Sequence, residues 1–361
     1  MRFNLYLFIS LIVSANCLFS QSIDSNYINQ INTSRGILQR LIRSEKIPGL
    51  SITITKENKK IWSEGFGFSN IEKKKIVKPE STLFRIASIS KPITATGLGT
   101  LSEDKFLDLD KSIYQYIPDF PKKKTSFTLR HLANHSSGVR HYRDKEFYNM
   151  LPLSIEEGIN IFKNDSLSFI PGQKFLYSSY GWNLISYVIQ KKMNTPFENF
   201  ISDSVFKPLK MNNTFPEING NDSSNISLFY HKSKEGKIYI AKEVNNFYKF
   251  ASGGFLSTTE DLVKFGNSYL NNDLLNKKTI EDFTHFQIIG GLRYNYGLGW
   301  QLLNDESNVL KSFYHVGKGV GGYGLLIVYP KEKIVISLLA NVGELDLEKE
   351  VFSMSKIFLN L

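Results

Sequence analysis

The sequence predicts an α+β fold in which one antiparallel sheet, built from strands at both chain ends, is flanked by helices and carries an inserted, mainly helical lobe. Three observations support this prediction. Apolar, strand-like runs occur early in the chain, similar runs return near its end, and roughly residues 95–245 between them have helical and loop-like patterns. We therefore expect a sheet lobe from about 24–87 and 246–361, a helical lobe from about 88–245, and a site in the cleft between them.

The early part of this domain should contain a helix and a β-hairpin. Apolar residues at nearly helical spacing predict a helix over residues 28–44. Residues 50–56 then alternate between apolar and polar side chains, and a second apolar run covers 60–68. Three polar residues, 57–59, separate the two runs, so these runs should pair as a hairpin.

The middle of the chain should be mainly helical. We expect a helix to begin at or near Ser88, and helical patterns follow at 93–101, 128–135 and 182–190. No internal repeat interrupts this region. It therefore reads as the lobe inserted between the two groups of strands.

Strand patterns return in the last fifty residues. Short apolar runs rich in β-branched residues cover 311–317, 323–330 and 333–341, with Gly-rich or Pro-Lys-Glu segments between them. An amphipathic pattern over 345–359 predicts a closing helix. These strands should complete the sheet that the early hairpin begins.

Composition indicates a folded protein and argues against a nucleic-acid partner. The 361 residues are 42% hydrophobic and 13% aromatic, which suits a sizeable core. A net charge of +10 is compatible with binding an anionic partner. The lysines are scattered, however, and the two short runs at 73–75 and 122–124 lie in polar, loop-like segments. We therefore expect no nucleic-acid partner.

Residues 1–20 have the pattern of a signal peptide for export. Arg2 precedes an apolar run at 5–13, which is too short to span a bilayer because a spanning helix needs about 20 residues. Cleavage near Cys17 or Ser20 would fit, and a lipid anchor on Cys17, the only cysteine, is the alternative. We expect a periplasmic or extracellular protein whose mature chain has no integral membrane segment and no disulfide.

Ser88 and Lys91 form the candidate catalytic pair. They lie one helical turn apart and share a helix face, so a neutral lysine amine could accept the serine proton. This requires burial to lower the lysine pKa from its usual value of about 10.4. Pro92 fits the first turn of a helix, whose free amides stabilise negative charge. The spacing alone favours two solvated surface residues, because S-x-x-K occurs by chance in many chains, so further motifs must decide.

Eight short motifs, distributed over nearly the whole mature chain, support the catalytic interpretation. They are I-P-G-L-S-I (47–52), G-F-G-F (65–68), T-L-F-R-I-A-S-I-S-K (82–91), T-L-R-H-L-A-N-H-S-S-G-V (128–139), P-G-Q-K-F-L-Y-S-S-Y-G-W-N-L-I (171–185), A-S-G-G-F-L-S-T-T-E-D-L (251–262), Y-G-L-G-W (296–300) and H-V-G-K-G (315–319). This ordered set resembles the serine β-lactamase and penicillin-binding-protein superfamily, on the class C and D-alanyl-D-alanine carboxypeptidase side. The segment H-S-S-G-V-R-H-Y at 135–142 is especially similar to the mitochondrial serine β-lactamase-like branch.

The resemblance implies a β-lactamase/transpeptidase-like fold and a set of catalytic roles. Ser88 matches the acylated nucleophile, Lys91 the buried lysine beside it, and Tyr177 the tyrosine that relays a proton to the leaving group. Ser179 stands where the family most often has asparagine. Its hydroxyl can bind a substrate carbonyl or Lys91, but it lacks the paired donor and acceptor of an amide, which weakens the case for efficient β-lactam hydrolysis.

The resemblance also implies substrate-binding residues in the late strands. His315 occupies the position of a lysine that pairs with a substrate carboxylate, although histidine is charged only part of the time near neutral pH. Gly317 would permit close approach of substrate to the strand edge. The backbone amides of Ser88 and Lys318 would form the oxyanion hole, in which one lost donor costs about 2.7–4 kcal/mol.

Two motifs suggest cofactors, and both are better explained otherwise. Residues 317–322 satisfy G-x-G-x-x-G, but a strand pattern follows where a dinucleotide site needs a helix. His131 and His135 have zinc-ligand spacing, but the glutamate of H-E-x-x-H and an evident third ligand are missing, so packing and capping around the turn at 136–138 is favoured. We expect neither a metal nor an organic cofactor.

The sequence thus predicts an exported serine hydrolase that forms an acyl-enzyme on Ser88. Peptide, amide or ester substrates are expected, with a peptidase, esterase or D-alanyl carboxypeptidase-like activity on small molecules, cell-wall peptides or β-lactams. One alternative is a true class C-type β-lactamase. The other is an inactive, penicillin-binding-like scaffold protein, against which the retained Ser88, Lys91 and Tyr177 argue.

Overall fold

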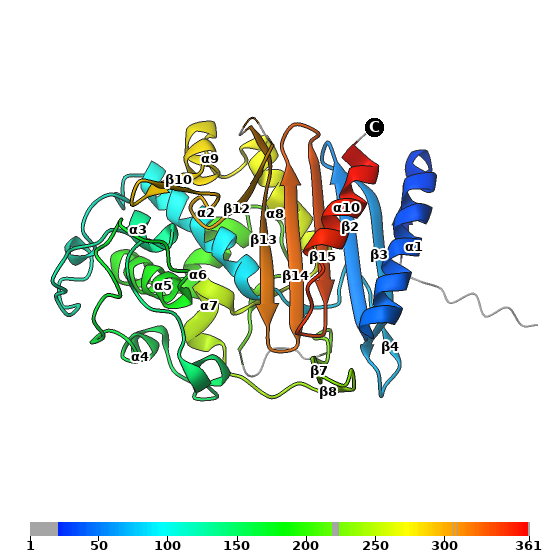
Figure 1. The fold of residues 1–361 in the computed structure, drawn as a ribbon, viewed down its shortest axis with the longest axis horizontal. Coiled ribbons are helices and arrows are strands. Elements are labelled where there is room, and N and C mark those ends of the chain that lie inside the picture. The colour runs from blue at the N-terminus through cyan, green and yellow to red at the C-terminus, as the bar shows by residue number, and fades with distance from the viewer. Residues whose placement is uncertain (1–20, 219–223, 306, 308, 360–361) are drawn as a thin grey trace, which may run out of the picture.

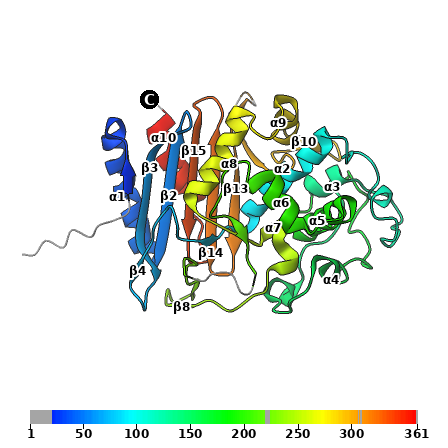
Figure 2. The same cartoon turned by 180° about the vertical axis from the view of Figure 1, so that it is seen from behind.

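An antiparallel sheet with helices on both faces forms one half of the molecule, and a helical lobe forms the other (Figures 1 and 2). The computed structural model describes residues 21–218, 224–305, 307 and 309–359. Within these residues the sheet has eight strands. In spatial order they are β1 (Gln21–Ile23), β3 (Lys59–Asn70), β2 (Gly49–Lys56), β15 (Ile334–Ala340), β14 (Gly322–Tyr329), β13 (Leu310–Gly319) and β12 (Gln301–Asn304), with β4 (Lys75–Ile76) paired to β3.

The two ends of the chain meet in the middle of this sheet. Strands β2 and β15 pair antiparallel, with Ile54 opposite Ile336. Every residue of β14 and β15 is buried, as expected for strands covered on both faces. The predicted hairpin of β2 and β3 is confirmed, and Glu57 and Asn58 at its turn both have positive φ. The predicted α+β architecture is therefore confirmed.

Different helices cover the two faces of the sheet. Helices α1 (Ile28–Glu45) and α10 (Glu348–Leu359) lie on the face seen in Figure 1 and enclose one hydrophobic core against it. Helix α8 (Thr259–Asn271) covers the opposite face and packs on β2, β14 and β15 (Figure 2). The predicted helices at 28–44 and 345–359 correspond to α1 and α10.

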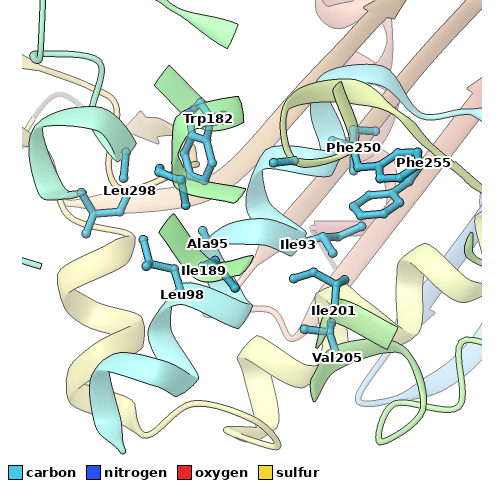
Figure 3. Close-up of a cluster of buried hydrophobic side chains, with 14 of the residues drawn as sticks. Ile93, Ala95, Leu98, Trp182, Ile189, Ile201, Val205, Phe250, Phe255 and Leu298 are labelled. Carbon is cyan, nitrogen blue, oxygen red and sulfur yellow. The ribbon is translucent and has the colours of Figure 1, made fainter. Parts of the chain in front are cut away.

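The helical lobe is built around α2 (Ser90–Glu103), which is almost entirely buried although it carries polar as well as apolar side chains. Figure 3 shows Ile93, Ala95 and Leu98 of α2 within a cluster of buried side chains from several elements. The other helices of the lobe are α3 (Leu129–Ala133), α4 (Ile155–Ile159), α5 (Ser179–Met193), α6 (Phe197–Ile201), α7 (Phe250–Gly253) and α9 (Lys277–Phe283). Helix α7 packs on α2 and α5. The boundaries predicted for the two lobes stay a prediction.

Short strands connect these layers. Strand β9 (Phe255–Ser257) pairs with β5 (Phe84–Arg85) and β6 (Phe215–Pro216), and two separate hairpins are formed by β7 (Tyr230–Lys232) with β8 (Ile238–Ile240) and by β10 (Gln287–Ile289) with β11 (Leu292–Tyr294). The G-x-G-x-x-G segment, residues 317–322, comprises the end of β13, a two-residue turn and the first residue of β14. The strand predicted to follow this segment is thus confirmed.

The predicted signal peptide, residues 1–20, and Cys17 lie outside the described residues. Among the helices that the structure describes, none combines the length and the apolarity needed to cross a bilayer.

Candidate active site

Ser88 lies where strand β5 turns into helix α2. Ala87 has a left-handed backbone with φ 45°, and residues 87–89 form a 3₁₀ turn before α2 begins at Ser90. A non-glycine residue in this region costs about 1–3 kcal/mol and persists only where neighbouring structure holds it. The turn leaves the Ser88 side chain partly exposed while most residues around it are buried. This turn therefore presents the Ser88 hydroxyl at an accessible position.

Strand β13 supplies the support for this turn. A Cβ atom at Gly317 would clash with the carbonyl oxygen of Ile86, and one at Gly319 would lie 3.1 Å from the Cβ of Ala87. The two glycines therefore let β13 approach the backbone that carries Ser88. The sequence predicted that a substrate would approach Gly317 closely. In the structure, the group that approaches Gly317 is the backbone of this turn.

The Lys91 side chain contacts Ser88 from within the protein interior. It is 0% exposed, and its Nζ lies 3.0 Å from Ser88 Oγ. Nζ also donates to the carbonyl oxygen of Ser252 at 2.6 Å and lies 3.4 Å from Ser179 Oγ. No carboxylate of the described residues forms an ion pair with this amine. The structure thus brings together the predicted pair and Ser179.

Burial determines the protonation state of Lys91. Loss of solvation lowers its pKa well below the usual value for lysine, and no carboxylate of the described residues is paired with it to offset this effect. A neutral amine has two N–H groups and one lone pair. If the N–H groups face Ser252 and Ser179, the lone pair is free to accept the proton of Ser88.

Tyr177 lies beside this pair. Its ring centroid is 4.9 Å from Lys91 Nζ. Burial raises the pKa of the phenol, and a hydrogen bond with Ser88 offsets part of that rise. Near neutral pH the phenol therefore keeps its proton, which suits a group that donates to a leaving group. In the free protein, Lys91 rather than a tyrosinate is the available base.

Ser179 begins helix α5 on the other side of Lys91. Its backbone N–H donates to Nδ1 of His141 at 3.1 Å, and its hydroxyl faces Lys91 as described above. Both Ser88 and Ser179 line a narrow cavity of about 50 Å³ that opens to solvent. The cavity is lined by Arg85, Ala87, Ser88, Tyr142, Phe147, Ser179, Val244, Asn246, Lys249, Ser252, Gly253, Lys318, Gly319 and Val320.

Lys318 can contribute its backbone amide at this cavity. The amide of Val316 points away from β14, since it donates to Oε1 of Gln301 at 3.1 Å. Because amide directions alternate along a strand, the amide of Lys318 faces the same edge. The side chain of Lys318 is paired with Glu348 at 3.2 Å. An oxyanion hole made of the Ser88 and Lys318 amides stays a prediction, and this strand geometry is compatible with it.

His315 lies beneath the site and is 1% exposed. Its Nδ1 is 2.8 Å from the carbonyl oxygen of Val316, so Nδ1 carries the proton and Nε2 accepts from the hydroxyl of Tyr296 at 3.2 Å. Burial lowers the pKa of His315 to about 3, and so does the positive charge that Lys91 carries when it is protonated in acid. His315 is therefore neutral at physiological pH, in contrast to the partial charge that the sequence suggested, and it does not line the cavity.

Two further histidines hold the site and were not assigned to it from the sequence. His135 accepts a hydrogen bond from the Ser178 amide at 3.0 Å, its carbonyl accepts from the Leu176 amide at 2.8 Å, and its ring packs on Tyr177 with centroids 4.3 Å apart. His141 binds the Ser179 amide. The predicted packing role of His135 is thus confirmed, with Tyr177 as its partner. The H-S-S-G-V-R-H-Y segment was the available sequence signal.

His131 has a separate role at the start of helix α3. Its Nδ1 accepts from the Thr128 amide at 3.3 Å, and its own amide donates to the Thr128 hydroxyl at 3.1 Å. This reciprocal cap is the predicted alternative to zinc binding. No group of three potential metal ligands occurs within the part of the chain that the structure describes.

Acid should destabilise the fold through the buried histidines. The pKa of His315 is lowered to about 3, whereas an unfolded histidine titrates near 6.5. Between these values the unfolded state binds a proton that the folded state rejects, so stability is fully present above about pH 6.5 and falls as the pH decreases. This residue alone should account for about 3 kcal/mol at pH 4.

Urea unfolding of the wild type and His315→Gln at pH 7 and pH 4 measures this effect. The variant should lose markedly less stability between the two pH values than the wild type does. His285→Gln, at an exposed histidine, is the matched control and should follow the wild type. An equal acid loss in wild type and His315→Gln would contradict a neutral, buried His315.

Comparison with known proteins gives consistent matches over most of the chain. The family model described as Beta-lactamase matches residues 35–351. Serine beta-lactamase-like protein LACTB, mitochondrial, from Homo sapiens is 30% identical over 314 residues, covering 68% of this chain and 57% of that protein. Penicillin-binding protein 4* from Bacillus subtilis (strain 168) is 28% identical over 302 residues, covering 79% of this chain and 66% of that protein. The chain thus spans between about half and two thirds of the length of these relatives.

A solved structure shows the same fold. D-amino acid amidase from Ochrobactrum anthropi SV3, complexed with D-phenylalanine, superposes with a TM-score of 0.80 at 22% identity, covering 92% of this chain and 99% of that one. At this identity the match supports the fold alone. The β-lactamase/transpeptidase-like fold is thereby confirmed.

Proposed function

This chain is a serine hydrolase of the beta-lactamase family, and from that premise we propose that it forms an acyl-enzyme on Ser88 and hydrolyses small amide, peptide or ester substrates. One observation carries the proposal. A fully buried amine, whose pKa is lowered by burial, lies 3.0 Å from the accessible hydroxyl of Ser88 at the wall of a cavity. That geometry suits general-base activation of a serine nucleophile.

The reaction follows from the positions of three side chains. Ser88 Oγ attacks the substrate carbonyl carbon while Lys91 Nζ takes the hydroxyl proton, and the oxyanion that forms is bound by the amides of Ser88 and Lys318. The bond to the leaving group then breaks, and Tyr177 passes a proton to the departing nitrogen or oxygen. Lys91 then returns its proton to Tyr177. Water next attacks the acyl carbon and gives one proton to Lys91, which passes it to Ser88 Oγ as the ester bond breaks, so that the acid and free Ser88 are released. An amine or alcohol in place of water would give acyl transfer.

Two features favour amide, peptide or ester hydrolysis over efficient β-lactam hydrolysis. Ser179 donates and accepts through a single hydroxyl oxygen, whereas an asparagine amide would offer a donor and an acceptor on two separate atoms. His315 is neutral and buried, so it provides no fixed cation for the carboxylate that β-lactams carry. The relatives include a penicillin-binding protein, which supports cell-wall peptides as candidate substrates. The pattern of residues 1–20 supports action outside the cytoplasm.

A substrate panel tests this proposal. Purified protein is assayed with p-nitrophenyl acetate, D-phenylalanine amide, D-alanyl-D-alanine peptides and nitrocefin. We expect kcat/KM for the best ester or amide to exceed that for nitrocefin by at least about tenfold, and intact-mass analysis to detect an acyl adduct on Ser88. Faster nitrocefin hydrolysis would favour the class C-type β-lactamase. Absence of both turnover and fluorophosphonate labelling of folded protein would favour the inactive scaffold.

A further inference from the structure

Three cationic side chains line the cavity beside the nucleophile, and two of them are already neutralised. Arg85 forms an ion pair with Glu217 at 2.6 Å, and a second guanidinium nitrogen of Arg85 binds a backbone carbonyl. Lys318 forms an ion pair with Glu348 at 3.2 Å and is half exposed to solvent. The third cation, Lys249, has no such partner among the side chains that the structure describes.

Lys249 lies just before α7, a helix of the lobe that packs on α5 (Figure 1). The residue is only 4% exposed. Its Nζ donates to the carbonyl oxygen of Phe147 at 3.0 Å and lies 5.6 Å from the ring centroid of Tyr142 and 5.2 Å from that of Tyr248. A carbonyl and two ring faces stabilise an ammonium group, but they do not neutralise it. A buried cation without a counter-charge is costly, so this amine is positioned to gain from an anionic ligand.

The charge of Lys249 is partly retained near neutral pH. Burial and the neighbouring Arg85 lower its pKa to about 8, and Glu217 raises it against those effects. At pH 7 most Lys249 side chains therefore carry a proton. An anion bound beside it would raise the pKa again and keep the ammonium form.

No cation is present at the position where the family usually has a carboxylate-binding lysine. That position holds His315, which is buried, neutral and hydrogen-bonded to Tyr296. An anionic substrate group would find no cation at that position. Lys249, in contrast, shares the cavity wall with Ser88 and Ser179.

We propose that Lys249 is a specificity-determining residue, whose ammonium group binds a carboxylate of the substrate held in the Ser88 cavity. This inference rests on the proposed hydrolase function and narrows its substrates to those that carry a negative charge in the acyl or the leaving group. A charge-assisted hydrogen bond of this kind should favour the charged substrate about 10–100-fold in kcat/KM.

Matched pairs of esters test the proposal. One pair is the p-nitrophenyl esters of glutaric acid and of glutaramic acid, which differ only in a terminal carboxylate or amide on the acyl side. The other pair is 3-carboxyphenyl acetate and 3-carbamoylphenyl acetate, which place the same difference in the leaving group. In at least one pair, wild type should prefer the carboxylate at least about tenfold, and added salt should reduce that preference.

Lys249→Met should remove most of this preference, mainly by raising KM for the charged ester. Lys191→Met, at an exposed lysine paired with Glu156 on the far end of α5, is the control and should keep the wild-type ratio. Fluorophosphonate titration of Ser88 counts folded active sites in each preparation. If Lys249→Met does not fold, Lys249→Gln and the salt dependence of the wild-type ratio serve as the readouts.

Two failures are distinguishable. Turnover by wild type without a carboxylate preference in either pair, or a preference that Lys249→Met retains in full, overturns the role of Lys249 and leaves the hydrolase proposal intact. Absence of turnover of every ester together with absence of Ser88 labelling overturns the hydrolase proposal itself.

Discussion

Replacing Ser88 by alanine should lower kcat for the best ester or amide substrate by about 10⁴-fold or more. The reason is that the covalent intermediate forms on Oγ of Ser88, which is the hydroxyl oxygen 3.0 Å from Lys91 Nζ. Binding should change little, because the alanine leaves the cavity and the turn at 87–89 in place. Turnover, together with covalent labelling by a fluorophosphonate or labelled penicillin, measures the effect.

Ser90 provides the matched control for this experiment. It is fully buried, and its Oγ accepts from the amide of Phe255 at 3.4 Å on the core side of α2. Ser90→Ala should therefore retain labelling and most of the activity in the fraction that folds. Labelling of Ser88→Ala at another serine, or turnover close to wild type, would show that the nucleophile lies elsewhere.

Replacing Lys91 by methionine should lower the rate of acylation of Ser88 by about 10³–10⁴-fold. Methionine has nearly the same length, so it fills the buried space, and removal of a buried amine should leave the folded state at least as stable. The variant keeps the nucleophile but loses the base. The measurement is the second-order rate of fluorophosphonate labelling, which reports acylation directly.

The pH dependence separates loss of the base from a packing defect. The pKa of Lys91 is lowered by burial, so the acid limb of the wild-type acylation rate should lie well below the usual lysine value. Activity should be present above that pKa and disappear as the pH falls through it, since the protonated amine cannot accept. Lys91→Met should lack this limb, and Lys91→Arg should not restore the rate because a guanidinium stays charged. Labelling of Lys91→Met at the wild-type rate would exclude Lys91 as the base.

Much of this architecture was predictable because local patterns and tertiary structure agree. The alternation in residues 50–56 and the β-branched runs from 311 to 341 specify strands, and the helical spacing at 28–44 specifies α1. Ser88 and Lys91 were predictable as a pair because their spacing fixes a common helix face. The short strands β5, β6 and β9 have two or three residues each, too few for a periodic pattern to appear.

Other features depend on contacts between distant segments. Lys249 is locally one lysine among many, and only the packing of Phe147 and Tyr142 over it makes it a buried cation. The neutrality of His315 likewise depends on its burial and on Lys91, which is far away in sequence. The need for glycine at 317 comes from the backbone of Ile86. A sequence pattern reports the periodicity of one segment. The burial of Lys249, the neutrality of His315 and the need for Gly317 each depend on how two distant segments pack together.

The central position of β15 has a consequence for how the protein is made. This strand separates β2 from β14, so a nascent chain that ends before residue 334 already contains Ser88, Lys91 and Tyr177 but has a gap through the middle of its sheet. The hairpin of β13 and β14, which contacts the turn at Ala87, would then lack the strand that joins it to β2. Pairings between the first and last parts of a long chain form slowly, because the loop that joins them must close first. During synthesis, Ser88 is therefore present long before the sheet that supports the active site is complete. Truncation near the C-terminus should abolish activity as completely as removal of the Ser88 hydroxyl.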